Sequence, residues 1–249
     1  MPHTLRQSLG LALLLATASV ASAEPVIVRY TEGVTRGFPV LRTQSGDVLA
    51  HGDFVQVAHT ERVESRLVFR FRDGSLYDES VTFDQRGVFT LLNYRIIQRG
   101  PSFPESLDGS FDRATGEYRV RYRADEDSKE EVLTGKVDVP ADVYNGLLST
   151  LLKNLEPGKS QTVQIVAFTP KPRFIKMLLR PAAEEPVSMG ATMVPATRFS
   201  LKPQLGAFAS LIVTDIPDVK TWIAQGDAPA FLKFEGPLYF MGPIWRIDF

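Results

Sequence analysis

The stretch Arg66-Leu67-Val68-Phe69-Arg70-Phe71-Arg72 is the clearest indication of fold class, because apolar and charged side chains alternate along almost its whole length. A leucine and two phenylalanines occupy one face of this run, and three arginines occupy the other. A period of two is typical of a strand with one buried face and one solvated face, as in antiparallel sheets. Asp73-Gly74 then provides a tight turn before the strand-like run 76–83. The stretch therefore predicts a β-hairpin.

Similar strand-like runs cover most of the remaining chain and predict many more strands. The expected strands are residues 26–30, 40–43, 54–59, 88–98, 117–123, 132–139, 161–169, 174–180, 197–202, 208–214, 231–234 and 245–249. An open sheet of this size curls or splits. We expect a mostly β fold, an antiparallel curled sheet that forms a half-barrel or barrel-like shape. Outer-membrane barrels also end on an aromatic strand, so an integral barrel is the alternative.

One segment departs from the period of two. Apolar residues recur at helical spacing across residues 143–155, and Pro157-Gly158 stops the run. We expect this segment to be the one main helix and to pack on the sheet, and a shorter helix is expected over 218–224. The acidic stretch 125–131 is interpreted as a solvated hairpin loop, because it lacks the ordered ligands of a calcium loop.

The first 23 residues have the three parts of a secretory signal peptide. Arg6 supplies positive charge, residues 9–20 are apolar, and Ala21-Ser22-Ala23 is a small-x-small cleavage site. Cleavage near Ala23 would release residues 24–249 as a single β-rich domain. We therefore expect an exported protein, periplasmic or secreted.

Composition and motifs exclude several classes of function. The chain has no cysteine, which removes thiol catalysis, and its net charge of −1 argues against nucleic acid as a partner. It contains no serine-hydrolase motif, phosphate-binding glycine loop or dinucleotide fingerprint. His51 and His59 flank Asp53, but Gly52 makes a shared strand face doubtful. We expect no catalytic residues, no metal site and no cofactor, and we favour a protein that is not an enzyme.

The candidate ligand site lies on the expected strand 174–180. Phe174, Lys176, Leu178 and Arg180 would share one strand face, so two cations alternate with two apolar side chains. Such a face could hold an anionic amphiphile, with its head group on the cations and its tail along the sheet. Trp222 is a further candidate for the lining of this site. An exposed face with long side chains lying over apolar neighbours would look the same.

The order of elements resembles a family of uncharacterised exported proteins of Gram-negative bacteria, known as a domain of unknown function. The resemblance rests on the helix 143–155, the following Leu155-Glu156-Pro157-Gly158-Lys159, Gly190-Ala191-Thr192, and the closing 222–229 with its Trp222-x-x-x-Gly226 spacing. It covers roughly the second half of the chain. It implies a periplasmic β half-barrel related in shape to lipoprotein carriers.

These observations favour an exported, non-catalytic binding or envelope-maintenance protein. The expected partner is a lipid or another apolar or amphiphilic small molecule, and an envelope protein is a second expected partner. Two other classes stay open: an envelope hydrolase that uses paired carboxylates, and a structural module that pairs its sheet edge with another protein.

Overall fold

The computed structural model describes residues 25–204 and 218–249, and nearly all of its regular structure is β-strand. The strands are β1 (Thr35–Gly37), β2 (Val40–Thr43), β3 (Val48–Ala58), β4 (Val63–Phe71), β5 (Leu76–Asp84), β6 (Thr90–Arg99), β7 (Ser106–Asp112), β8 (Glu117–Arg123), β9 (Glu131–Lys136), β10 (Gln161–Thr169), β11 (Lys171–Met189), β12 (Thr192–Gln204), β13 (Val219–Ala224), β14 (Phe231–Gly236) and β15 (Trp245–Asp248). One helix, α1 (Leu148–Asn154), separates β9 from β10.

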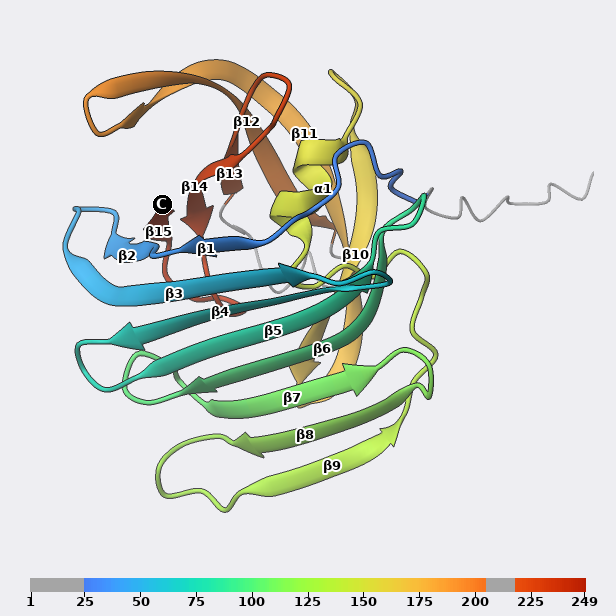
Figure 1. Ribbon diagram of the computed structural model, residues 1–249. Coiled ribbons are helices and arrows are strands. Elements are labelled where there is room, and N and C mark those ends of the chain that lie inside the picture. Colours follow the sequence, from blue (N-terminus) through green and yellow to red (C-terminus); the bar gives the residue numbers. More distant parts are fainter. Residues whose placement is uncertain (1–24, 205–217) are drawn as a thin grey trace, which may run out of the picture.

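All fifteen strands belong to one antiparallel sheet (Figure 1). The hydrogen-bonded order is β10-β11-β12-β13-β14-β15-β2-β3-β4-β5-β6-β7-β8-β9, and β1 pairs with β3 outside this path. The sheet curls so that β10 approaches β6 and β7, yet the edge strands β9 and β10 do not pair with each other. The predicted mostly β fold, a curled antiparallel sheet with one packed helix, is confirmed.

The half-barrel has two facing walls, one that contains β6 and β7 and an opposite one that contains β10. These walls meet through aromatic packing and not through backbone hydrogen bonds. The Phe168 ring of β10 lies on Gly109 of β7, where an added Cβ atom would lie only 2.5 Å from the ring. Phe168 also stacks against Tyr94 of β6, with ring centroids 6.4 Å apart. A glycine at position 109 therefore gives the opposite wall room to approach.

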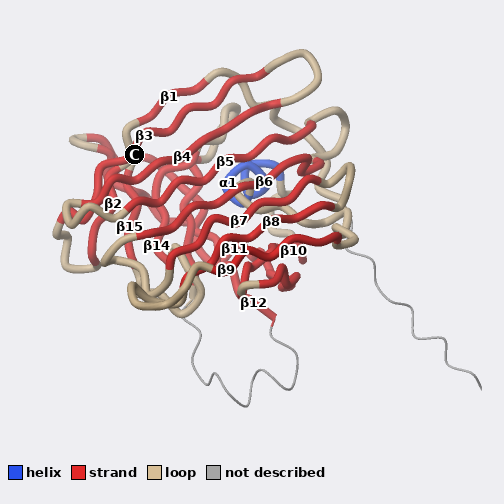
Figure 2. The backbone as a smooth tube through the Cα atoms, turned by 90° about the horizontal axis from the view of Figure 1, so that it is seen from below, coloured by secondary structure: helices blue, strands red, loops and turns tan. Residues whose placement is uncertain are grey.

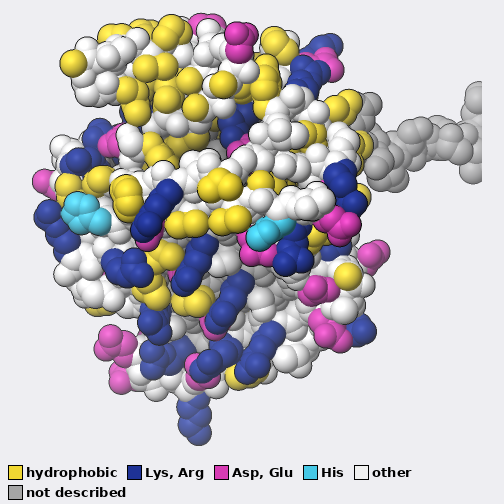
Figure 3. Space-filling view, in the orientation of Figure 1, with side chains coloured by type: hydrophobic (Ala, Val, Ile, Leu, Met, Phe, Trp, Pro, Cys, Tyr) yellow, Lys and Arg dark blue, Asp and Glu magenta, His cyan; other side chains and the backbone are white. Residues whose placement is uncertain are grey.

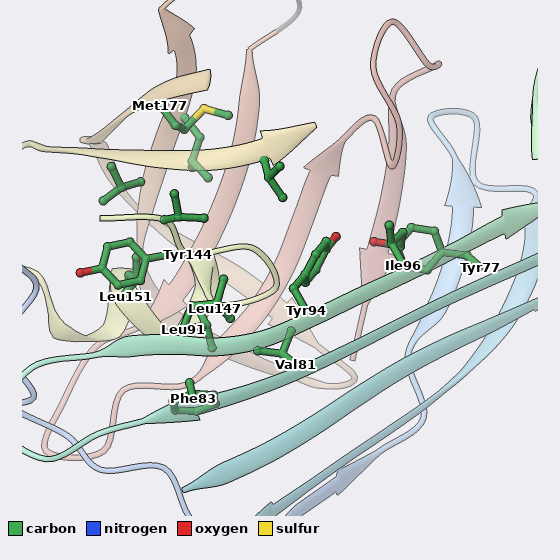
Figure 4. Packing of buried hydrophobic residues seen from close by; sticks show 14 of the residues in the cluster. Tyr77, Val81, Phe83, Leu91, Tyr94, Ile96, Tyr144, Leu147, Leu151 and Met177 are labelled. Atoms are coloured by element: carbon green, nitrogen blue, oxygen red, sulfur yellow. The ribbon is translucent and has the colours of Figure 1, made fainter. Parts of the chain in front are cut away.

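α1 fills the space between the walls (Figure 2). Tyr144, Leu147 and Leu151 are fully buried and lie toward the side chains of β5 and β6, including Val81 and Leu91 (Figure 4). This segment belongs to the same hydrophobic cluster as β10 and β11. The interior is therefore a packed core. None of the described helices is long and apolar enough to cross a membrane.

The segment before β1 holds α1 in place through polar contacts. The backbone N–H groups of Arg29 and Tyr30 both donate to Asn154 Oδ1 at 2.7 Å. The largely buried side chains of Glu32 and Lys153 form an ion pair at the same helix. The C-terminal end of α1 is thus fixed by polar contacts.

Two helix predictions need correction. Residues 218–224 were expected to be helical, but Val219–Ala224 is strand β13, since its β-branched and aromatic side chains pack between β12 and β14. The main helix begins at Leu148 and not near residue 143. Gly146 has a φ of 67°, which ends regular helix geometry, and a Cβ atom there would meet Val81 at 2.2 Å.

The strand predictions are largely confirmed, with three departures. β1 and β7 were not expected, and residues 26–30 form only an isolated bridge at Ile27. Several strands are also longer than expected, β11 most of all. The expected strand 208–214 lies outside the described residues.

Candidate functional site

The outer face of strands β3 to β9 carries an open groove of about 1090 Å³. Strand alternation places arginine, serine, threonine and carboxylate side chains on this face, while the aromatic residues of the same strands point into the core. The Lys and Arg side chains gather over β4 to β8 in the space-filling view (Figure 3). The groove runs across the strands, from Val55 on β3 to Thr134 on β9.

One row of residues along this groove, which we name the central row, has an arginine on every second strand. Sheet register aligns Arg36, Val55, Arg66, Ser80, Arg95, Ser110, Arg119 and Thr134 as successive neighbours. Neighbouring strands lie about 4.8 Å apart, so successive arginines of the row stand about 10 Å apart at their backbones. Small residues between them leave room above the sheet for a ligand.

Carboxylates of the adjacent row hold two of these arginines in place. Arg66 donates to both oxygens of Asp78, at 2.8 and 2.5 Å, and Arg95 donates to both oxygens of Asp108 at 2.9 Å. The hydrogen bonds from these guanidinium groups raise the pKa of both arginines. Bidentate pairing fixes the plane of a guanidinium group. The central row is therefore partly neutralised and largely ordered.

A second row, which we name the end row, has no acidic residue. Arg70 lies opposite Leu76, which lies opposite Arg99. Arg123 lies opposite Ser106 of β7. The last pair between β6 and β7 is Gln98 with Leu107, so the same register continues to Arg99 and Ser106. The side chains of these three arginines are without a hydrogen bond or ion pair to any residue in the described ranges. Arg70, Arg99 and Leu76 line a second hollow of about 480 Å³ beside the groove.

The opposite side of the groove supplies hydrogen-bond acceptors. Glu64, Asp112 and Glu117 line it together with Thr82 and Asn93. Glu117 and Lys136 approach to 3.6 Å, and both are mostly exposed. The groove thus combines cationic donors on one side with carboxylates, an amide and hydroxyl groups on the other.

The strand face predicted from the sequence lies elsewhere, on β11. Lys176 and Arg180 are exposed, whereas Leu178 is half-buried and Phe174 packs against the core cluster. Register places Arg180 opposite Ser200 and Ser200 opposite Lys220. The predicted face of alternating cations and apolar side chains therefore exists on β11, but Phe174 packs mainly against the core.

Trp222 lies on the same wall, two residues from Lys220 on β13, and it is only 6% exposed. Its indole Nε1 donates to Glu185 Oε1 at 2.6 Å, and the Lys233 ammonium lies 4.5 Å from its ring centroid. With its polar atom and one ring face already in use, Trp222 offers little surface to a ligand. The structure does not join it to the strand face 174–180 as one open site.

The arginine rows were missed at the sequence level, although their parts were visible. The alternation in 66–72 predicts one solvated strand face, and 117–123 is an expected strand. Nothing in the sequence states that Arg66, Arg95 and Arg119 fall in one row, because that depends on register across five strands.

One carboxyl group lies inside the half-barrel. Glu79 of β5 accepts a hydrogen bond from the Tyr94 hydroxyl at 2.9 Å and another from Tyr77. Burial raises the pKa of Glu79, and the two tyrosine hydrogen bonds offset part of that effect. A glycosidase needs two carboxyl groups that face each other. The polar groups around Glu79 are phenols, so this cluster lacks the pair that the hydrolase alternative requires.

The fold and the groove define a β-barrel-like protein built from one open antiparallel sheet. A solved structure of this class is the β-barrel-like protein of the domain of unknown function DUF1849 from Brucella abortus. The similarity covers 90% of this chain and 96% of that chain, with a TM-score of 0.50 and 10% sequence identity. No protein-family model matches the chain, and no curated protein matches its sequence. The likeness shows the fold, and it is consistent with the expected kinship to uncharacterised β-rich proteins.

Proposed function

We propose that this protein is an exported binding module, and that its outer groove holds a linear, anionic, hydroxyl-rich chain of the acidic-glycan class. The observation that carries this proposal is the end row, where Arg70, Arg99 and Arg123 stand exposed without a hydrogen bond or ion pair to any carboxylate of the described residues, although the charge of Arg123 helps to lower the pKa of Asp125. By contrast, Arg66 and Arg95 of the central row are paired with carboxylates. Three unpaired guanidinium groups in one row favour a ligand that brings its own negative charges.

The shape of the groove supports an elongated ligand. It crosses the strands, and the arginines of the central row recur about every 10 Å along it. The end row runs beside the groove with the same spacing and reaches it at Arg70. A chain with regularly spaced carboxylates or sulfates could contact several arginines at once. Single contacts of this exposed kind contribute little, about 0.2–1 kcal/mol each, so useful affinity requires several of them on one chain.

The acceptor side of the groove supports hydroxyl groups on the ligand. Asn93, Asp112 and Glu117 can accept hydrogen bonds from sugar hydroxyls while the arginines contact the charged groups. The interior of the half-barrel offers no comparable place, because Leu147 and Leu151 of the α1 segment fill it. The outer groove is therefore the better candidate for the binding surface.

The proposal is tested by calorimetric titration of the protein with polygalacturonate oligomers of increasing length, with neutral dextran as the uncharged probe. We expect affinity for the acidic oligomers to rise with length and fall with salt, and we expect no binding of dextran. The triple variant R70Q/R99Q/R123Q should lose about 3- to 150-fold in affinity, which corresponds to three exposed contacts of about 0.2–1 kcal/mol each.

A matched triple variant, R29Q/R86Q/R173Q, removes the same charge from exposed arginines outside the groove, and the ion-pair partners of Arg29 and Arg86 do not line the groove either. It should bind the oligomers as the unmodified protein does. Equal losses in both triple variants would show that net charge, and not the end row, governs binding. No binding of any acidic oligomer by the unmodified protein would overturn the proposal.

A further inference from the structure

The two edges of the sheet differ in how they end. The β10 edge is covered: Tyr144 N donates to Gln164 O at 3.0 Å, and the Asn145 side chain bonds both backbone groups of Val166. The β9 edge has no such cover among the described residues, since β9 pairs with β8 alone. An uncovered edge presents unpaired backbone groups to another strand.

The hydrogen bond beyond the end of β9 shows which backbone groups are free. Val137 N donates to Gly116 O at 2.9 Å, so the N–H and C=O groups of residue 137 point toward β8. These groups alternate in direction along an antiparallel strand. Those of Val132, Thr134 and Lys136 therefore point away from β8. Val132, on this edge strand, is also 53% exposed.

We infer that the β9 edge is the interface with a second copy of this chain, which adds its own β9 antiparallel to the first. A twofold axis perpendicular to the sheet relates two such strands, so residue i faces residue j of the other copy only when i + j is even. With Leu133 on the axis, Val132 faces Thr134 of the second copy. All the outward backbone groups from Glu130 to Lys136 then find partners.

Charge complementarity favours the register in which Leu133 lies on the twofold axis. Glu130 lies opposite Lys136 of the second copy, and symmetry repeats the pair on the other side of the axis. Both side chains point to the outer face, because Glu130 pairs with Arg121 and Lys136 with Glu117 on that face. The interface would thus continue each ion pair into an alternating network of four charges. Moving the axis to Thr134 would place Lys136 opposite Val132 and lose this complementarity.

The pairing has a consequence for the outer face. The groove ends at Thr134 and Lys136 on β9. A perpendicular twofold axis keeps both outer faces on the same side, so the two grooves would meet end to end across the interface. The association itself needs no ligand and does not depend on the proposed function.

Sedimentation velocity of the ligand-free protein over a range of concentrations tests the inference. The weight-average sedimentation coefficient should rise with concentration toward that of a dimer. K136E and E130K each place like charges opposite each other and should remain monomeric. The double variant E130K/K136E restores opposite charges across the axis and should dimerise again.

A second variant tests the backbone contacts. Thr134→Pro removes an N–H group that points away from β8, so it should abolish association while the circular dichroism spectrum and melting temperature stay unchanged. R70Q/R99Q/R123Q should dimerise normally, which separates this inference from the glycan proposal. A protein that stays monomeric up to its solubility limit would overturn the inference. The inference would also be overturned if the single charge variants were folded and monomeric but the double variant E130K/K136E did not dimerise. Continued association of Thr134→Pro would overturn it as well.

Discussion

At the scale of single residues, the protein places an acid where an apolar side chain would be expected. Glu79 lies on the inner face of β5, between Tyr77 and Val81, on strands whose other inward residues are mainly apolar. The residue keeps some exposed surface, but its carboxyl group is enclosed, and burial therefore raises its pKa. The hydrogen bonds from Tyr77 and Tyr94 stabilise the charged form only in part.

This raised pKa gives stability a defined pH dependence. The folded protein binds the Glu79 proton more tightly than the unfolded chain, so the contribution is complete below the ordinary value of 4.5 and falls as pH rises through the raised folded pKa. We expect Glu79→Gln to abolish this loss of folding stability with rising pH. Urea unfolding from about pH 4 to pH 8 should show the unmodified protein losing stability relative to the variant.

Glu126→Gln, at an exposed glutamate in the β8–β9 turn, is the matched control. Its free energy of unfolding should follow that of the unmodified protein at every pH. A constant difference between the unmodified protein and Glu79→Gln across the range would contradict the assignment, because it would show that Glu79 titrates alike in the folded and unfolded states.

At the scale of elements, one amide side chain closes part of the β10 edge. Asn145 Nδ2 donates to Val166 O at 2.9 Å, and Val166 N donates to Asn145 Oδ1 at 2.6 Å. Both residues are buried, so water does not replace these bonds. Asn145 therefore closes the strand edge and also fixes the approach to α1.

Asn145→Ala should lower the free energy of unfolding by about 2–4 kcal/mol, because it leaves a buried N–H and a buried C=O group unpaired. Chemical denaturation measures this directly. Asn93→Ala, at an exposed asparagine on β6, is the control and should change stability by less than about 0.5 kcal/mol. Similar effects of the two substitutions would show that the edge bonds matter little.

Three strands agree with the sequence pattern to the residue, whereas the glycine-containing β7 is not predicted at all. β2, β8 and β10 begin and end where the sequence pattern places them. β7 was missed because Gly109 takes the inward position between Leu107 and Phe111 and interrupts the apolar pattern. The reason for that glycine is the Phe168 ring, which belongs to the opposite wall.

At the scale of the whole molecule, the export signal remains a prediction with a simple test. Expression of the full chain in a Gram-negative host should give a periplasmic or secreted protein whose intact mass corresponds to a chain that starts at Glu24. Replacing the small residue at the cleavage site, Ala23→Leu, should cause the uncleaved precursor to accumulate. A cytoplasmic product that retains residues 1–23 would contradict the export prediction.

The candidate groove also belongs to this scale, and the sequence could not predict it. The site expected on 174–180 was inferred from one strand, and the structure shows that Phe174 and Trp222 are largely engaged in packing. The arginines of the two rows come from strands between β1 and β8 and are separated by up to 87 positions in the chain, from Arg36 to Arg123.

The β class and the central helix segment follow from the sequence alone, because alternation and helical spacing are local properties of neighbouring residues, and the number of strands predicts that the sheet curls. Only the tertiary structure decided which strands lie side by side, and so which arginines form rows. A shift of one residue in register would turn every side chain of a strand to the other face. That register is set by the packing of the whole core, in which β10 reaches Gly109 and α1 fills the interior.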